Sequence, residues 1–300
     1  MVDTQPTARV GQAPSSGPGR RPSRPARGRR TLRPGVVVLT LVAAVSAFPL
    51  YFMLVMASRR NEDITSVPPP LLPGDQLLDN IQRVLADPNV AFGKAVLNSL
   101  IVASTATAAV VIFSALAGFA FAKLEFTGRN PLLLVVIVTM MVPVQLGLIP
   151  LYMLMGWLHL SGRLPAVILP FLVSGFGVFM MRQFVQQAIP DEMLDSARLD
   201  GASPFKTFVF IVAPGLRPAA AVLALLTFME RWNDFLWPYL VLDQQHPVVQ
   251  VALSRLSGGY YTDQALVMAG TLLGVLPLLV VFIAFGRQIV GGIMEGGLKS

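Results

Sequence analysis

The chain has 300 residues, of which 54% are hydrophobic and only 13% are charged, and its formal net charge is +7. Soluble domains average about 25% charged residues, so this composition indicates a membrane protein rather than a soluble domain. Because the sequence contains no cysteine, disulfides, zinc fingers, thiolate iron–sulfur clusters and cysteine nucleophiles are excluded.

The first 34 residues carry much of the positive charge. They are rich in arginine, proline, glycine and serine, and Asp3 is their single acidic residue. High net charge with little apolar material predicts a disordered segment. We expect residues 1–34 to form a basic cytoplasmic tail attracted to anionic membrane lipid. Nucleic acid is not an expected partner, because no aromatic side chain is interleaved with the charges.

Six apolar segments follow, each long enough to cross a membrane as a helix. A helix needs roughly 20 apolar residues to span a hydrocarbon core of about 30 Å. The segments cover residues 35–57, 95–122, 131–155, 164–184, 209–230 and 265–286. The sequence therefore predicts an all-α polytopic membrane protein with six transmembrane helices. Together these helices form one transmembrane domain over residues 35–300.

Two of these segments have features that are unusual for a plain transmembrane helix. The first resembles a signal peptide, but its apolar run continues to Ala57, which favours an uncleaved transmembrane helix. The fifth is the weakest, because Pro214, Arg217 and Pro218 interrupt its start. The positive-inside rule places more lysine and arginine in the cytoplasm when both termini are cytoplasmic. Residues 58–94 then form an external loop long enough to contain a short helix.

The predicted cytoplasmic loop between the fourth and fifth segments has the pattern of a helix, a turn and a second helix. Asp191 can cap a helix or lie near its positive N-terminal end together with Glu192, and Gly201 suits a left-handed residue that ends that helix. Ser203 can cap a second helix that has Pro204 in its first position. An apolar stripe is expected from Met193, Leu194 and Ala197. By periodicity alone, an amphipathic connector lying on the membrane fits as well.

The same loop resembles the EAA loop of ATP-binding-cassette (ABC) importer permeases. The family pattern is Glu-Ala-Ala, three residues, Gly, nine residues, Ile, one residue, Leu-Pro. Asp195-Ser196-Ala197, Gly201, Ile211 and Ala213-Pro214 fall at this spacing without insertion or deletion. Asp195 replaces the glutamate of the pattern, Ser196 an alanine and Ala213 the leucine. The resemblance implies a coupling helix that docks on a separate ATPase subunit. The residues it assigns to this coupling loop are Asp195, Ser196, Ala197, Asp200, Gly201, Ile211 and Pro214.

Further segments resemble the carbohydrate subfamily of these permeases, of the maltose and cellobiose type, over residues 35–300. They include Asn98–Ala103, Ala120–Phe126, Met141–Pro143 and Arg231–Phe235. The resemblance implies a multi-pass protein of the bacterial plasma (inner) membrane that forms half of a translocation pathway for a sugar or oligosaccharide. The implied partners are a different permease subunit in a heterodimer, an ATPase dimer and an extracellular solute-binding protein.

ATP hydrolysis is expected on another chain. The sequence contains no Gly-x-x-x-x-Gly-Lys-[Ser/Thr] motif, so the phosphate-binding loop of an ATPase is missing. We therefore expect a transport subunit that is not itself an enzyme, with no cofactor and no metal site.

Polar residues at membrane depth are candidates for the solute pathway, because they are costly unless they face a cavity or another helix. Sugars offer hydroxyls and apolar ring faces, so amides, carboxylates and aromatic rings suit them. The candidates are Asn98, Gln145, Glu230, Trp232, Asn233, Asp234 and Trp237. The alternative for residues 230–237 is an interfacial aromatic belt with solvated charges.

Two other functions remain compatible with a six-span protein. An ion-coupled secondary carrier would need buried ionisable residues in mid-span and paired broken helices. A membrane scaffold that transports nothing would not depend on the cytoplasmic loop. Replacing Gly201 by a bulky β-branched residue separates these alternatives from an importer permease.

Overall fold

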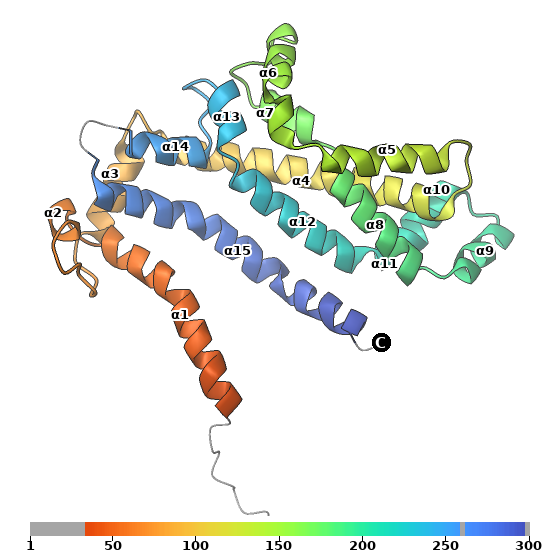
Figure 1. Ribbon diagram of the computed structural model, residues 1–300, viewed down its shortest axis with the longest axis horizontal. Coiled ribbons are helices and arrows are strands. Elements are labelled where there is room, and N and C mark those ends of the chain that lie inside the picture. The colour runs from red at the N-terminus through yellow and green to blue at the C-terminus, as the bar shows by residue number, and fades with distance from the viewer. Residues whose placement is uncertain (1–33, 259–261, 298–300) are drawn as a thin grey trace, which may run out of the picture. The chain divides into compact units, whose positions relative to one another are not determined.

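The computed structural model describes residues 34–258 and 262–297, and in these ranges all regular structure is helical (Figure 1). The predicted basic tail, residues 1–34, lies outside the described residues except for Pro34. The chain divides into two compact units, residues 1–47 and residues 48–300. Helix α1 begins in the first unit and ends in the second.

The helices of the N-terminal half are α1 (Pro34–Ala57), α2 (Asn61–Ile64), α3 (Leu77–Ala86), α4 (Phe92–Lys123), α5 (Arg129–Met141), η1 (Val144–Gly147) and α6 (Leu148–Trp157). Then come α7 (Pro165–Ile168), η2 (Leu169–Phe171), α8 (Gly175–Ala188), α9 (Asp191–Leu199), α10 (Pro204–Thr207), η3 (Phe208–Val212) and α11 (Ala213–Gly215). The last four are α12 (Arg217–Trp232), α13 (Leu236–Val241), α14 (Val249–Leu256) and α15 (Gln264–Gly297).

Three helices are individually long and apolar enough to cross a membrane, namely α1, α4 and α15. They correspond to the first, second and sixth predicted segments. Helix α4 contains 32 residues and no proline, so its ladder of backbone hydrogen bonds is not interrupted by a missing donor. Pro49 in α1 and Pro277 in α15 are accommodated within their helices, as is common in membrane helices.

The third, fourth and fifth predicted segments differ from the expectation of single continuous helices. Each is a pair of helices that meet at a bend, of 92° between α5 and η1–α6, 40° between α7–η2 and α8, and 76° between α10–α11 and α12. Pro143 separates the first pair. The first half of the third pair contains the π-helical turn η3, and the pair bends between Pro214 and Pro218, as the prolines of the fifth segment predicted.

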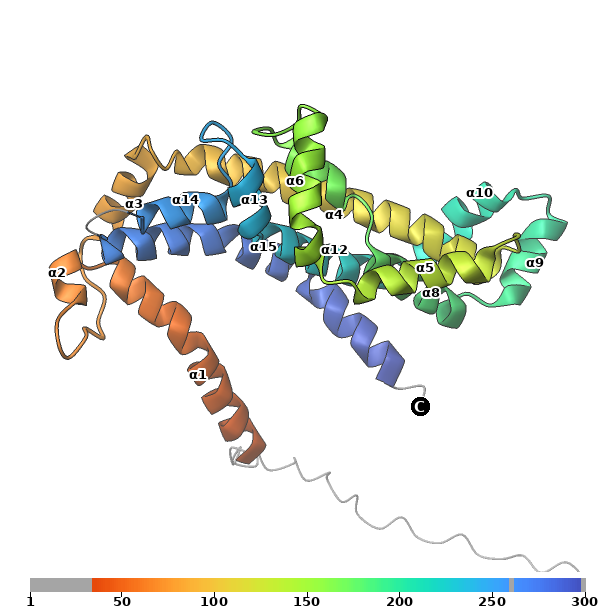
Figure 2. The ribbon, with the colours of Figure 1, turned by 45° about the horizontal axis from the view of Figure 1, so that its top comes forward.

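Helix α4 is the central element of the unit formed by residues 48–300. It packs along α8 and α12, and Figures 1 and 2 show α3 near one of its ends and α10 near the other. Its buried side chains belong to three apolar clusters, represented by Phe92, Val102 and Phe119. A single straight helix therefore contacts every part of the apolar core found among the described residues.

Close approach of α4 to α8 depends on small residues. A Cβ atom added to Gly118 would lie 2.6 Å from the Cβ atom of Met181, and one added to Gly177 would lie 2.3 Å from Ser114 Oγ. Neither position can accept a larger side chain unless the helices separate. Small residues at such contacts are typical of helix packing in membranes.

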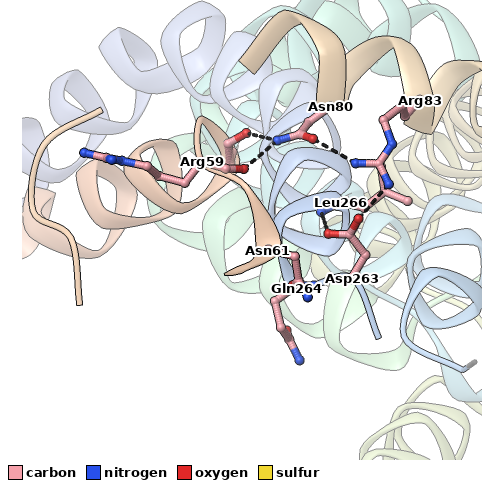
Figure 3. A network of polar contacts seen from close by, with 8 residues as sticks. Arg59, Asn61, Asn80, Arg83, Asp263, Gln264 and Leu266 are labelled. Carbon is pink, nitrogen blue, oxygen red and sulfur yellow. Dashed lines mark hydrogen bonds and ion pairs between the residues drawn. The ribbon is translucent and has the colours of Figure 1, made fainter. Parts of the chain in front are cut away.

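A polar network joins the end of α1 to α3 and to the start of α15 (Figure 3). Asn80 is buried and donates through Nδ2 to the carbonyl oxygens of Ala57 and Arg59, at 2.9 and 3.0 Å. Arg83 donates to Asn80 Oδ1 and forms a 2.6 Å ion pair with Asp263. Short helices do form within residues 58–94, as expected, and this network fixes them to α15.

Candidate coupling segment and solute pathway

The predicted helix–turn–helix between α8 and α12 is present. Helix α9 begins at Asp191, which is an acidic residue of its first turn, and is not capped by a side chain. Gly201 has a φ of +75°, and its N–H bonds to the carbonyl of Arg198 while that of Ala202 bonds to the carbonyl of Ala197. This pair of bonds is the Schellman motif that ends a helix at a left-handed glycine. Ser203 then caps α10 by accepting a hydrogen bond from the backbone N–H of Lys206.

The expected apolar stripe of α9 is only partly buried. Leu194 and Ala197 are buried, and Leu194 belongs to the apolar cluster that contains Phe119 of α4. Met193, in contrast, is 47% exposed, so the stripe is not buried over its whole width. Met193 is four positions before Ala197 and about 100° from Leu194, which places it at the edge of the buried stripe. Together with Leu199, which is 89% exposed, it gives α9 an uncovered apolar surface.

An ion pair ties the start of α9 to the end of α4. Lys123 Nζ lies 2.6 Å from Asp191 Oδ1, and the Lys123 side chain is only 9% exposed whereas that of Asp191 is 79% exposed. The hydrogen bond from Lys123 and its positive charge lower the pKa of Asp191 below its ordinary value. The sequence carries no local signal for this pair, because 68 residues separate the two side chains along the chain.

The remaining residues of the predicted coupling loop lie along one continuous segment. Asp195 forms an exposed ion pair with Arg198 at 2.9 Å, and Ser196 Oγ donates to the carbonyl of Glu192 at 2.8 Å. Asp200 is exposed next to Gly201. The other two are Ile211, which is half-buried in η3, and Pro214, which is exposed in α11 at the bend before α12.

Four of the seven predicted pathway residues line one hollow of about 240 Å³. They are Gln145, Glu230, Asp234 and Trp237. A neighbouring hollow of about 470 Å³ shares Glu230 with it and extends between α5 and α8. Each of the three bent helix pairs contributes residues to these hollows.

Arg231 is a residue of both hollows that sequence analysis did not select. Its guanidinium is paired with Glu230 and Asp234, and its Cζ atom lies 4.2 Å from the centre of the Phe171 ring. The Arg231 side chain is 11% exposed, whereas that of Glu230 is 67% exposed. Its position between two acidic residues in the sequence was the signal that could have identified it. The Glu230 carboxylate can accept hydrogen bonds from a solute in the hollow.

The other three predicted pathway residues do not line these hollows. Asn98 is buried and donates to the carbonyl of Pro247 at 2.8 Å. Trp232 is 1% exposed and donates from Nε1 to the carbonyl of Gly274 at 3.1 Å. Asn233 donates to the carbonyl of Met229 at 2.8 Å. Asn98 therefore connects α4 to the segment before α14, Trp232 connects α12 to α15, and Asn233 binds the last turn of α12. Within the described residues, no group of three or more His, Asp or Glu side chains is arranged to hold a metal ion.

The chain is similar to known transport proteins along most of its length. It is 34% identical over 263 residues to the lactose transport system permease protein LacG of Rhizobium radiobacter, covering 87% of this chain and 94% of that one. It is 35% identical over 204 residues to the arabinooligosaccharides transport system permease protein AraQ of Bacillus subtilis (strain 168), covering 68% and 72%. It is 31% identical over 265 residues to the sn-glycerol-3-phosphate transport system permease protein UgpE of Escherichia coli O6:K15:H31, covering 86% and 94%.

The fold is also that of a solved transporter chain. A chain in the crystal structure of a bacterial ABC transporter involved in the import of the acidic polysaccharide alginate superposes with a TM-score of 0.72, covering 84% of this chain and 94% of that one, at 22% identity. Residues 112–293 match the family model of the binding-protein-dependent transport system inner membrane component. This multi-pass membrane protein therefore belongs to that family of inner-membrane permease subunits.

Proposed function

We propose that this chain is a permease subunit of an ABC importer and forms half of the translocation pathway for a sugar or oligosaccharide. A second, different permease would form the other half. A separate pair of ATPase subunits would hydrolyse ATP, and an extracellular solute-binding protein would deliver the solute. Two relatives carry the names of lactose and arabinooligosaccharide transport systems, which supports a carbohydrate solute.

In this proposal the chain crosses the membrane six times, with both termini in the cytoplasm. Helices α1, α4 and α15 each cross once, and each of the three bent helix pairs counts as one crossing. The positive-inside rule supports this orientation. Residues 1–34 would be a basic cytoplasmic tail, and residues 35–300 one transmembrane domain. Helix α9 then lies on the cytoplasmic side, between the fourth and fifth crossings.

The observation that carries the proposal is the surface of α9. Leu194 and Ala197 anchor this helix in the protein, while the apolar side chains of Met193, at the edge of the buried stripe, and of Leu199, on the far side, stay uncovered. Phe205 of α10, which is 69% exposed, adds to that surface. Burying such a side chain fully contributes about 1.5–3 kcal/mol, so a cleft on the ATPase would bind this segment favourably. The Schellman turn at Gly201 keeps the segment short and stiff enough to transmit force.

The hollow lined by Glu230 and Asp234 suits the chemistry of a sugar. Carboxylate oxygens and the Gln145 amide can exchange hydrogen bonds with hydroxyls, and the ring of Phe171 can face the apolar side of a pyranose. The tightly packed Trp237 forms part of the wall. Asn98, Trp232 and Asn233 would support this pathway by holding its helices in place.

The test replaces Gly201 by valine in the assembled transporter reconstituted in liposomes. No heavy atom lies within 4 Å of the added Cβ position, so the change acts on the backbone, whose positive φ costs a non-glycine residue roughly 1–2 kcal/mol. Gly93→Val is the control, because Gly93 also has open space but no positive φ. We expect Gly201→Val to insert normally but to lose solute uptake and solute-stimulated ATPase activity.

Two other outcomes would contradict the proposal. Uptake that continues without ATP would indicate a secondary carrier. Unchanged uptake and ATPase activity in Gly201→Val would mean that the turn does not take part in coupling.

A further inference from the structure

The two ends of α4 are both fixed to segments that are distant in the sequence. At its C-terminal end, Lys123 pairs with Asp191 of α9. Near its N-terminal end, Asn98 and Ser99 bind the backbone before and at the start of α14. At 32 residues, α4 is about 48 Å long and joins these two contacts through one proline-free helix.

The contact at the Lys123 end is favoured by both helices. Lys123 is the last residue of α4, where a cation is stabilised by the helix dipole, and Asp191 is the first residue of α9, where an anion is stabilised. The lysine side chain is 9% exposed, and it lines a small cavity of about 60 Å³ together with Phe119 and Leu194. A lysine held in this way has little freedom to follow α9 by changing its rotamer.

The contact at the other end of α4 is also buried. Asn98 and Ser99 are 5% and 4% exposed. Asn98 Nδ2 donates to the carbonyl of Pro247 at 2.8 Å, and Ser99 Oγ accepts from the backbone N–H of Val249 at 2.9 Å. Displacing α4 along its axis would therefore displace residues 247–249 or break both hydrogen bonds.

We propose that Lys123 and Asp191 form a strut that passes displacement of α9 to α4 and, through Asn98 and Ser99, to residues 243–249 at the far end of that helix. The inference rests on the proposed function, in which α9 receives motion from an ATPase. Covalently, α9 is attached only to α8 and, through a short turn, to α10. The ion pair, together with the packing of Leu194 in the cluster that contains Phe119, also attaches it to α4, the helix that packs against both α8 and α12. Lys123 and Asp191 are positioning residues, because they act through α4 and not on the solute.

The first experiment exchanges the two charges in the transporter reconstituted with its natural partners. Lys123→Glu and Asp191→Lys each place like charges together, and we expect solute uptake to fall roughly tenfold, the range of a typical coupling between sites. The double variant K123E/D191K restores an opposite pair of similar reach and should recover most of the uptake. Lys94→Glu, which makes the same charge change elsewhere on α4, should retain uptake. If the double variant inserts normally but loses as much solute uptake as the single variants, the proposed role of the ion pair is wrong.

The second experiment follows motion at the far end of α4 directly. Because this chain has no cysteine, Gln245→Cys in the exposed turn before Pro247 introduces the only thiol of the chain, and its labelling is read on this subunit after the subunits are separated. Its rate of labelling by a membrane-impermeant maleimide is measured in ATP-free and vanadate-trapped transporter. We expect the rate to differ between the two states in the otherwise natural chain and to become equal when Lys123→Met is added. A purely structural role of Lys123 would not remove this difference while ATP is still hydrolysed.

The outcomes separate the strut from the proposed function. If the natural chain shows no ATP-dependent labelling difference and no ATP-dependent uptake, the proposed function fails. If the difference is present and persists unchanged in Lys123→Met and in Asp191→Asn, the proposed function stands and the strut is overturned.

Discussion

The guanidinium of Arg231 lies over the ring of Phe171, with the Cζ atom 4.2 Å from the ring centre. Arg231 is near the end of α12 and Phe171 ends η2, so this contact joins two of the three bent helix pairs. The same guanidinium forms ion pairs with Glu230 and Asp234, and all three side chains line the hollow. The last residue of η2, just before the bend, therefore contacts a residue of another helix pair.

Replacing Phe171 by leucine should weaken this connection. A desolvated cation–π contact contributes about 2 kcal/mol, and Arg231 is 11% exposed, so we expect the Tm of the purified protein in detergent to fall by a few degrees. Thermal denaturation followed by circular dichroism measures the change. Phe113→Leu, which shortens a 45% exposed ring on α4, is the matched control. Equal Tm values for the two variants would show that the contact contributes nothing beyond ordinary burial.

Asn80→Ala should destabilise the contact between the end of α1, α3 and α15. The change leaves the carbonyl oxygens of Ala57 and Arg59 and the guanidinium of Arg83 without the Asn80 partner that they have now. Unsatisfied buried polar groups cost about 1–3 kcal/mol each, and Asn80 is 2% exposed. The expected result is a lower Tm and faster limited proteolysis within residues 58–76.

Asn89→Ala is the control for this change, because Asn89 is an exposed asparagine in the same connection. If its Tm falls as much as that of Asn80→Ala, the buried network of Figure 3 does not account for the effect.

The ion pair between Lys123 and Asp191 should be insensitive to pH in the physiological range. Lys123 lowers the pKa of Asp191 below the ordinary value of 3.8. A carboxylate with a lowered folded pKa contributes its full stabilisation above its unfolded pKa and loses it as the pH falls through the folded value. The contribution is therefore complete at neutral pH, unchanged down to about pH 5, and lost only below about pH 4.

The measurement is the difference in Tm between the natural transporter and its Asp191→Asn variant from about pH 5 to about pH 8, above the ordinary range of aspartate titration. A constant difference is expected. A difference that shrinks between neutral pH and pH 6 would mean that a group with a higher pKa controls this contact.

Local features of the sequence predicted much of the coupling segment. Gly201 and Ser203 act through their own backbone or the next few residues, so the end of α9 and the start of α10 were both predicted correctly. The prolines around residue 214 similarly predicted the interruption before α12. The bend at Pro143 was not predicted, because proline is often tolerated inside a membrane helix and its neighbours decide whether the helix bends.

Contacts between distant residues had no such local signal. Periodicity grouped Met193 with Leu194, and only the position of α4 determined that Leu194 is buried and Met193 is not. Arg231 was not selected as a pathway residue, although Phe171 and two carboxylates surround its guanidinium.

The sequence by itself determined the membrane environment, the long apolar helices, the turn at Gly201 and the family resemblance, because each depends on composition or on residues close in the chain. The tertiary structure decided which polar side chains meet. It brought Lys123 to Asp191 and closed Glu230, Arg231 and Phe171 around one hollow. Such pairings depend on how helices pack, and packing energies come from side chains that many intervening residues separate along the chain.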